Sequence, residues 1–152
     1  MPDDAGSSLD SEAPLPEITT LIPHRSPLLL MDAILEDGED CCVGQITVDR
    51  GAWYAELDGS MPGWFGLELM AQTIAAHSGN RKRLQCQPVK FGYLLGSNDY
   101  RCLEPSFPAG AVLTVVVQHC FGEGVGLNAF DCEVRRGDRT LANAMLKVYE
   151  EP

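Results

Sequence analysis

The sequence predicts an α+β domain in which an antiparallel sheet wraps around one long buried helix. Residues 65–76 are almost entirely apolar and show no clear polar stripe, which is typical of a buried helix. Alternating or β-branched segments lie both before and after this stretch, and most of them are joined by tight turns. Strands on both sides of a single apolar helix favour antiparallel pairing around it. The order of the strands stays open at this stage.

Length and composition indicate one folded unit with a short tail. The chain has 152 residues, of which 45% are hydrophobic, so it can bury a sizeable core. The first residues are acidic, small and poor in apolar side chains. We therefore expect a disordered tail over residues 1–14 and a single domain over residues 15–152.

The charge of the chain excludes several partners. A formal net charge of −11 argues against binding to nucleic acid or to an anionic membrane surface. No apolar run reaches the length of a membrane span, and the N-terminus lacks the layout of a signal peptide, so we expect a cytoplasmic protein.

Six cysteines are spread along the chain without a C-x-x-C pair and without a histidine at zinc spacing. We expect reduced, mostly buried thiols, and neither a metal site nor a cofactor. The cysteines are Cys41, Cys42, Cys86, Cys102, Cys120 and Cys132.

The N-terminal third should form a short helix and a hairpin. Residues 15–22 suit a short helix, and residues 23–27 contain two prolines and predict an irregular turn. Residues 28–35 are apolar and predict a strand. A turn at residues 37–40 then leads to a second strand, residues 42–49, paired with the first.

A loop over residues 50–60 precedes the central helix. Pro62 has a fixed φ and no N–H, which suits the start of a helix. Gly79 is a plausible C-cap, and the cationic run that follows suits a helix C-terminus electrostatically.

The C-terminal half predicts four strands. Residues 88–104 form a long strand with bends at Gly92 and Gly96, and residues 105–110 form a turn. Three further strands, separated by glycine-containing turns, are expected at residues 111–121, 127–135 and 140–149.

Glu68 and Gln72 stand out in the central helix because they are polar residues in an apolar segment. Their four-residue spacing puts them on one helix face. An ionised carboxylate is costly among apolar side chains unless it is paired or the site is built for it. Such a conflict between pattern and residue type often marks a functional position.

The same region carries a resemblance to a known family. Met61-Pro62-Gly63, with Glu68 seven positions after Met61 and Gln72 four positions later, resembles the motif of the β-hydroxyacyl-acyl carrier protein dehydratases. That family has the hot-dog fold, so the resemblance implies a hot-dog domain.

Further segments agree in order and spacing, so that the resemblance covers roughly residues 18–149. Pro23-His24-Arg25-x-Pro27 is similar to the family's N-terminal segment, and the stretch from Gly92 to Gly110 is similar to its G-x-L-x-G strand and following turn. The motifs P-G-W-x-x-L-E-L-M-A-Q and S-F-P-A-G most closely resemble those of the divergent dehydratase-like proteins of aryl polyene-type pathways.

The resemblance implies a lyase that acts on acyl thioesters in fatty acid or polyketide-type synthesis. Dehydration needs a base for the α proton and an acid for the leaving hydroxyl. Glu68 is expected to act as the acid, since burial favours its protonated form, and Gln72 to orient Glu68 or the hydroxyl. Backbone N–H groups at the helix start would hold the thioester carbonyl. The expected substrate-binding residues are Met61, Pro62, Gly63 and Trp64.

The family's catalytic histidine has no counterpart at the matching position, which is Tyr54. A tyrosine there could donate a hydrogen bond or act as a weak acid, but its ordinary pKa makes it a poor base. His24 lies in a segment that is structural in the family. His77, nine residues after Glu68, points to the opposite helix face, where capping or surface exposure is expected.

The missing histidine suggests a partner chain. The family's sites lie between protomers, so we expect either a homodimer or a heterodimer with a His-bearing hot-dog paralogue that borrows Glu68. Arg81, Lys82 and Arg83 are the candidate docking patch for an acidic acyl carrier protein. Two other functions stay open: a hot-dog acyl thioesterase, and a non-catalytic subunit that binds the acyl carrier.

Overall fold

The computed structural model describes residues 14–89 and 92–152. Apart from Pro14, the predicted tail lies outside the described residues. Six strands form one antiparallel sheet in the order β1-β2-β7-β8-β9-β4, and the short β5 also pairs with β9. A second, two-stranded sheet joins β3 to β6.

Three long strands form the centre of the sheet, and short elements surround them. The short elements are η1 (Ile18–Thr20), β1 (Ala33–Asp37), β2 (Cys41–Thr47), β3 (Met61–Pro62), η2 (Gly63–Phe65), β4 (Gly92–Gly96), β5 (Arg101–Cys102) and β6 (Ser106–Phe107). The long elements are the helix α2 (Gly66–Leu84) and the strands β7 (Val112–Phe121), β8 (Gly126–Arg136) and β9 (Arg139–Glu150).

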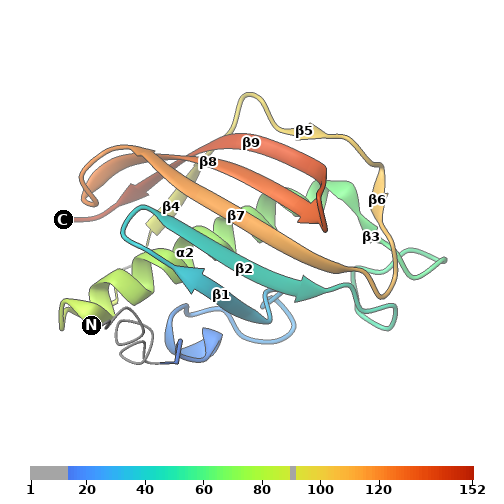
Figure 1. Ribbon diagram of the computed structural model, residues 1–152, viewed down its shortest axis with the longest axis horizontal. Coiled ribbons are helices and arrows are strands. Elements are labelled where there is room, and N and C mark those ends of the chain that lie inside the picture. The colour runs from blue at the N-terminus through green and yellow to red at the C-terminus, as the bar shows by residue number, and fades with distance from the viewer. Residues whose placement is uncertain (1–13, 90–91) are drawn as a thin grey trace, which may run out of the picture.

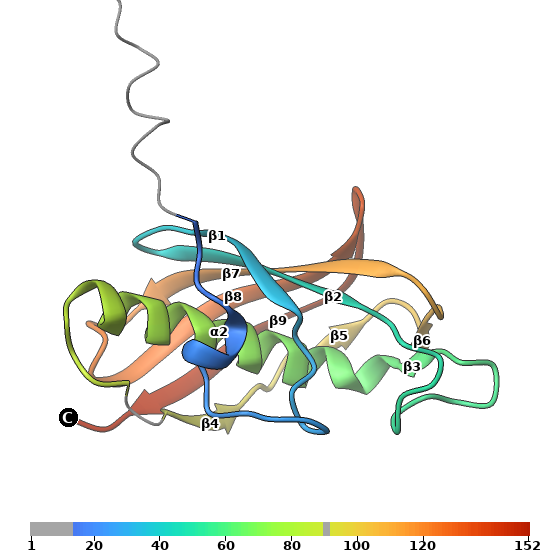
Figure 2. The same ribbon diagram turned by 90° about the horizontal axis from the view of Figure 1, so that it is seen from below.

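The sheet curves over α2, which lies along its inner face (Figures 1 and 2). Leu69 and Met70 of α2 are fully buried, and so are the inward-facing Leu113 and Val115 of β7. Buried and more exposed residues alternate along β7, so every second side chain points into the core and one face of the strand packs against the helix. The predicted fold, an antiparallel sheet around one long helix, is confirmed.

The segment before β1 differs from the prediction. The expected helix over residues 15–22 shrinks to the single 3₁₀ turn η1, and the expected strand over residues 28–35 begins only at Ala33. The backbone of Leu28, Leu30 and Met31 bonds instead to one side chain of α2, which holds residues 28–31 outside the sheet. Figure 2 shows this segment crossing α2.

The predicted C-cap at Gly79 is wrong, because α2 continues to Leu84. Gly79 is buried within the helix, where a Cβ would collide with the backbone carbonyl of Leu21. The glycine therefore permits a close approach between α2 and the segment that crosses it. The C-cap residue is instead Gln85, which is followed by Cys86 with a φ of 57°.

The predicted strand over residues 88–104 is split into β4 and β5, both paired with β9. The predicted turn over residues 105–110 contains β6, which pairs with β3 just before the helix. The strands β7, β8 and β9 agree with the prediction to within one or two residues at each end.

All six cysteines are free thiols, as predicted, but only Cys42 and Cys132 are buried, so the expectation of mostly buried thiols is wrong. Among the described residues, no helix combines the length and the apolar character that a bilayer span needs.

Candidate functional site

The start of the central helix is built by close backbone packing. Gly63 donates its N–H to the carbonyl of Pro105 over 2.9 Å, and its own carbonyl accepts the Tyr100 hydroxyl over 2.6 Å. A Cβ at Gly63 would collide with Cys102 Sγ and Glu104 O. The Gly63 N–H is therefore occupied by Pro105 and is not free for a ligand.

Glu68 and Gln72 lie one turn apart on α2 and are in direct contact. Gln72 Nε2 donates to Glu68 Oε1 over 2.9 Å and to Leu28 O over 2.9 Å. Gln72 Oε1 accepts from Leu30 N and Met31 N over 2.9 and 3.2 Å. The fully buried amide of Gln72 thus restricts the Glu68 carboxylate and anchors the crossing segment.

Glu68 is less buried than expected. Its side chain is 44% exposed in the single chain, whereas we expected it to be enclosed among apolar side chains. The expectation failed because Glu68 does not lie on the helix face that packs against the sheet. Glu68 instead belongs to a stripe at helical spacing that lines a cavity of about 870 Å³. The other members of this stripe are Ala71, Ala75, Ser78 and Lys82.

The cavity has the size of a small-ligand site and mixed polar and apolar walls. It lies between α2, the turn around His24, the edge strand β4 and the turn that joins β7 to β8. The turn at Met61–Trp64, which we expected to bind substrate, does not line it. Met61 belongs to the buried core, whereas Trp64 is 67% exposed and stacks on Phe65.

His24 is the residue that the sequence interpretation undervalued. Its Nε2 lies 3.9 Å from Glu68 Oε1, and both side chains line the cavity. Its Nδ1 is buried and has no hydrogen-bond partner among the described residues. The only hint in the sequence was the position of His24 between two prolines, in a segment that could be rigid.

Tyr54 lies in the loop before β3, packed against Trp53 and Phe65 at ring-centroid distances of 6.0 and 5.7 Å. Its hydroxyl accepts a hydrogen bond from Asp49 N over 2.9 Å. Burial raises the pKa of Tyr54, and nearby carboxylates raise it further, although the Asp49 N–H acts in the opposite direction. The phenol is therefore neutral at pH 7 and cannot act as a base.

The basic run at the end of α2 is largely occupied by internal partners. Arg81 pairs with Asp37 over 2.8 Å, and Lys82 pairs with Glu150 over 2.7 Å. Arg83 is exposed and donates to Asn80 over 3.0 Å. These ion pairs tie the helix end to β1 and β9, so two of the three predicted docking cations face the protein rather than a carrier.

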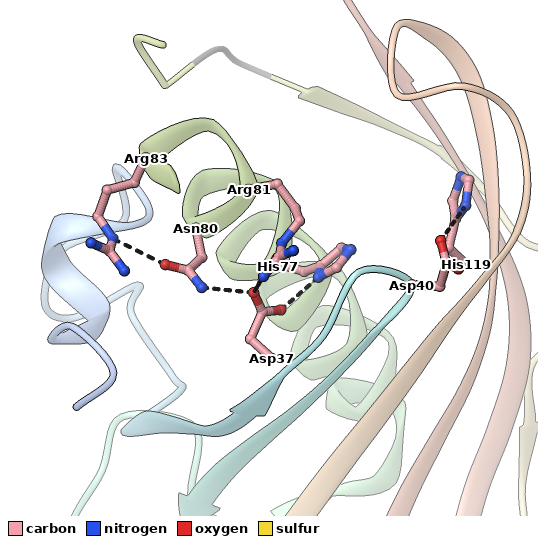
Figure 3. A network of polar contacts seen from close by, with 7 residues as sticks. All are labelled: Asp37, Asp40, His77, Asn80, Arg81, Arg83 and His119. Atoms are coloured by element: carbon pink, nitrogen blue, oxygen red, sulfur yellow. Dashed lines mark hydrogen bonds and ion pairs between the residues drawn. The ribbon is translucent and has the colours of Figure 1, made fainter. Parts of the chain in front are cut away.

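A buried polar network joins the end of β1 to the second half of α2 (Figure 3). The Asp37 side chain is completely buried, and its Oδ1 lies 2.6 Å from His77 Nδ1. Its Oδ2 accepts from Asn80 over 2.7 Å and from Arg81 over 2.8 Å. His77 is buried too, so the expectation of a capping or exposed role for it is wrong.

This network sets the ionisation of Asp37. Burial by itself would raise the pKa of the Asp37 carboxyl, but the hydrogen bonds from His77, Asn80 and Arg81, together with the electrostatic attraction of His77, lower it overall. Asp37, Cys42 and His77 offer atoms within 4.8 Å of one another, which is close enough for a metal ion. However, hydrogen bonds already satisfy the carboxylate, and burial raises the pKa of the Cys42 thiol. The cluster is therefore better suited to holding β1 against α2 than to binding a metal ion.

A single helix wrapped by an antiparallel sheet, with a carboxylate near the helix start, defines this chain as a hot-dog protein. The sequence matches the ApeP-like family, described as ApeP dehydratase, over residues 16–152, and the chain belongs to this family. Among solved structures it is similar to the dehydratase heterocomplex ApeI:P from Xenorhabdus doucetiae, with a TM-score of 0.86 and 26% identity. That match covers 91% of this chain and 93% of the other.

Curated relatives agree with this family. The 3-hydroxyacyl-[acyl-carrier-protein] dehydratase FabZ of Rhizobium leguminosarum bv. trifolii is 32% identical over 149 residues, covering 95% of this chain and 92% of the relative. FabZ of Agrobacterium fabrum is 36% identical over 150 residues, with coverages of 95% and 93%. The PaaI protein of Thermus thermophilus, at 18% identity and a TM-score of 0.57 with coverages of 78% and 91%, shares the fold.

Proposed function

We propose that the chain dehydrates (3R)-hydroxyacyl thioesters carried by an acyl carrier protein, in fatty acid synthesis or in polyketide-type synthesis such as aryl polyene formation. The observation that carries this proposal is the Glu68 carboxyl, held by Gln72 at 2.9 Å near the helix start and open to a cavity of about 870 Å³. The names of the FabZ relatives and of the ApeI:P structure support the same reaction class.

In this reaction Glu68 gives its proton to the leaving β-hydroxyl while a base removes the α proton. The carbon–oxygen bond breaks, the carbon–carbon double bond forms, and water leaves. Backbone N–H groups at the start of the helix are proposed to stabilise the negative charge that develops on the thioester oxygen. Tyr54 is too weak a base to take the α proton, so its part is limited to a hydrogen bond.

A second hot-dog chain is proposed to supply the base. The edge strand β4 supports pairing with such a chain, because it ends the sheet and exposes Tyr93, Leu94 and Leu95. An apolar, unpaired strand edge is a template for further strand pairing. The partner is either a second copy of this chain or, in keeping with the absence of a histidine at position 54, a His-bearing paralogue. The six free thiols support a cytoplasmic location.

The docking of the carrier is proposed at the exposed end of α2. Arg83 is the cation of the basic run whose side chain is most exposed, while Arg81 and Lys82 keep their internal ion pairs. A local positive charge is needed there, because both the carrier and this chain, with its net charge of −11, are acidic.

The test is an assay of the purified chain, alone and mixed with a His-bearing hot-dog chain, on a 3-hydroxyacyl-carrier substrate. We expect the enoyl product to form rapidly only in the mixture, and Tyr54→Phe to lower that rate modestly. Full activity of the chain alone, unaffected by Tyr54→Phe, would refute both the paired-chain proposal and the part given to Tyr54. Release of free thiol without enoyl product would identify a thioesterase instead.

A further inference from the structure

The two side chains that face each other beside the helix start, His24 and Glu68, are close but do not touch. The distance from His24 Nε2 to Glu68 Oε1 is 3.9 Å, which is too long for a direct hydrogen bond. Both side chains are partly exposed, at 31% and 44%, and both line the cavity. A polar separation of this size is commonly bridged by one oxygen atom.

The geometry of the gap fits such an oxygen. Two hydrogen bonds of about 2.8 Å that meet at one oxygen at roughly a right angle join atoms about 4 Å apart. Glu68 Oε1 is already held on its other side by Gln72 Nε2 at 2.9 Å, which limits its movement toward His24. The two groups therefore stay separated by about the width of one hydroxyl group.

The surroundings of the His24 ring decide which of its nitrogens carries a proton. Nδ1 is buried without a partner among the described residues, so an N–H there would lack an acceptor. A single ring proton is therefore favoured on Nε2, and a doubly protonated ring also carries one there. In both states His24 offers a hydrogen-bond donor toward Glu68.

The backbone around His24 is held by several hydrogen bonds, which fix the point from which its side chain extends toward the cavity. Arg25 donates to the carbonyls of His24, Ile22 and Thr19 over 2.7, 2.8 and 2.9 Å. Its own carbonyl accepts from Leu28 N over 2.8 Å. The segment is then attached to α2 by the same Gln72 amide that restricts Glu68.

We propose that His24 Nε2 and the Glu68 carboxyl together hold the β-hydroxyl oxygen of the substrate, with His24 as donor and Glu68 on the other side. This inference rests on the proposed function and adds a substrate-contacting residue to it. The hydroxyl oxygen accepts a hydrogen bond from His24 and shares a proton with Glu68. The pair thus selects acyl groups that carry a β-hydroxyl over saturated acyl groups of the same length.

The test compares the binding of two unreactive ligands, so that it does not depend on turnover. One is a medium-chain 3-hydroxyacyl amide of pantetheine, in which an amide replaces the thioester, and the other is the same molecule without the hydroxyl. We expect the wild-type assembly to prefer the hydroxylated ligand by about three- to tenfold, the contribution of one hydrogen bond. His24→Ala should abolish this preference, and His24→Gln, which keeps a donor, should retain part of it.

Two controls keep the result interpretable. Thr20→Ala removes the hydrogen bond to Glu17 O in the same segment, away from the cavity, and should leave the preference unchanged. In wild-type protein labelled with ¹⁵N-histidine, the hydroxylated ligand should shift the His24 Nε2 resonance more than the saturated ligand does. This measurement stands even if His24→Ala does not fold.

An unchanged preference in folded His24→Ala, or equal nitrogen shifts with both ligands, would overturn the inference. Neither result depends on catalysis. If no partner chain produces any dehydration while the hydroxyl preference is present and His24-dependent, the proposed reaction fails but the hydroxyl-binding pair stands.

Discussion

The Gln72 side-chain amide donates a hydrogen bond to Glu68 Oε1 over 2.9 Å, while its other bonds hold the backbone at Leu28, Leu30 and Met31. One buried residue thus links the proposed acid to the segment that carries His24. This arrangement separates two effects that mutations can distinguish, namely the chemistry of the carboxyl and the stability of the segment.

Glu68→Gln should remove the reaction while leaving the fold intact. The amide cannot transfer a proton, so we expect kcat in the complete assembly to fall by about 10²- to 10⁴-fold. Because the side chain is half exposed, the free energy of unfolding should change by less than about 0.5 kcal/mol. Glu36→Gln, at an exposed position in β1, is the matched control and should leave kcat unchanged. An unaltered rate in Glu68→Gln would instead favour the non-catalytic carrier-binding subunit.

Gln72→Leu should reduce both stability and rate. Leucine has a similar size, but it leaves the carbonyl of Leu28 and the N–H groups of Leu30 and Met31 without their partner in a buried region. We expect the free energy of unfolding to fall by about 2–4 kcal/mol, measured in urea. Turnover at a temperature where the variant stays folded should also fall, because Glu68 loses its fixed orientation. A variant as stable as the wild type would contradict this account of Gln72.

Asp37→Asn should weaken the protein at neutral pH and change its acid sensitivity. The Asp37 pKa is lowered from its ordinary 3.8, so its stabilising contribution is fully present well above that value and is lost as the pH falls through the lowered pKa. Removing the charge breaks a buried pair with His77 and Arg81, which should cost about 3–5 kcal/mol near pH 7.

The measurement for Asp37 is urea unfolding at pH 7 and at several values below pH 4. The difference between wild type and Asp37→Asn should shrink as the pH falls. Asp131→Asn, at an exposed site in β8, is the control and should show no such difference at pH 7. If the difference in stability between the two proteins stays constant from pH 7 to pH 3, the Asp37 charge is not what stabilises the contact between β1 and α2.

Leu95→Lys should prevent assembly through β4. Leu95 is 59% exposed on the edge strand, where a second chain would pair, and a charged side chain blocks edge-to-edge pairing. Sedimentation should show monomer in place of dimer, and dehydration should be lost with it. Leu35→Lys, 45% exposed on β1 at the opposite edge, should leave the assembly unchanged. A dimer that survives Leu95→Lys but not Leu35→Lys would locate the interface at the other edge.

Local patterns were enough for most of the fold. Alternation along β7, β8 and β9 and the apolar stretch within α2 predicted their places because they are set by the side chains of the segment itself. The prediction failed at residues 28–31, which are apolar and strand-like. There the backbone bonds to a glutamine more than forty residues away, and no local pattern reports that contact.

Parts of the site, too, could be predicted from local spacing, whereas others depend on tertiary contacts. The four-residue spacing of Glu68 and Gln72 already put them on one helix face, and the structure joins them by a hydrogen bond. Sequence reasoning treated His24 as structural and His77 as exposed, whereas the structure sets His24 3.9 Å from Glu68 and buries His77 against Asp37. The sequence also predicted that the basic run is free to dock a carrier, although Arg81 and Lys82 form ion pairs within the chain.

The amino-acid sequence by itself determined the α+β class, the central helix and the carboxylate–amide pair on it, because residues within one turn or one strand share a face by geometry alone. Only the tertiary structure decided which distant groups meet. His24 lies beside Glu68, and the buried Asp37 contacts His77, because the chain folds back across α2 and brings together groups that are far apart in the sequence. Which partners they find depends on how the whole core packs.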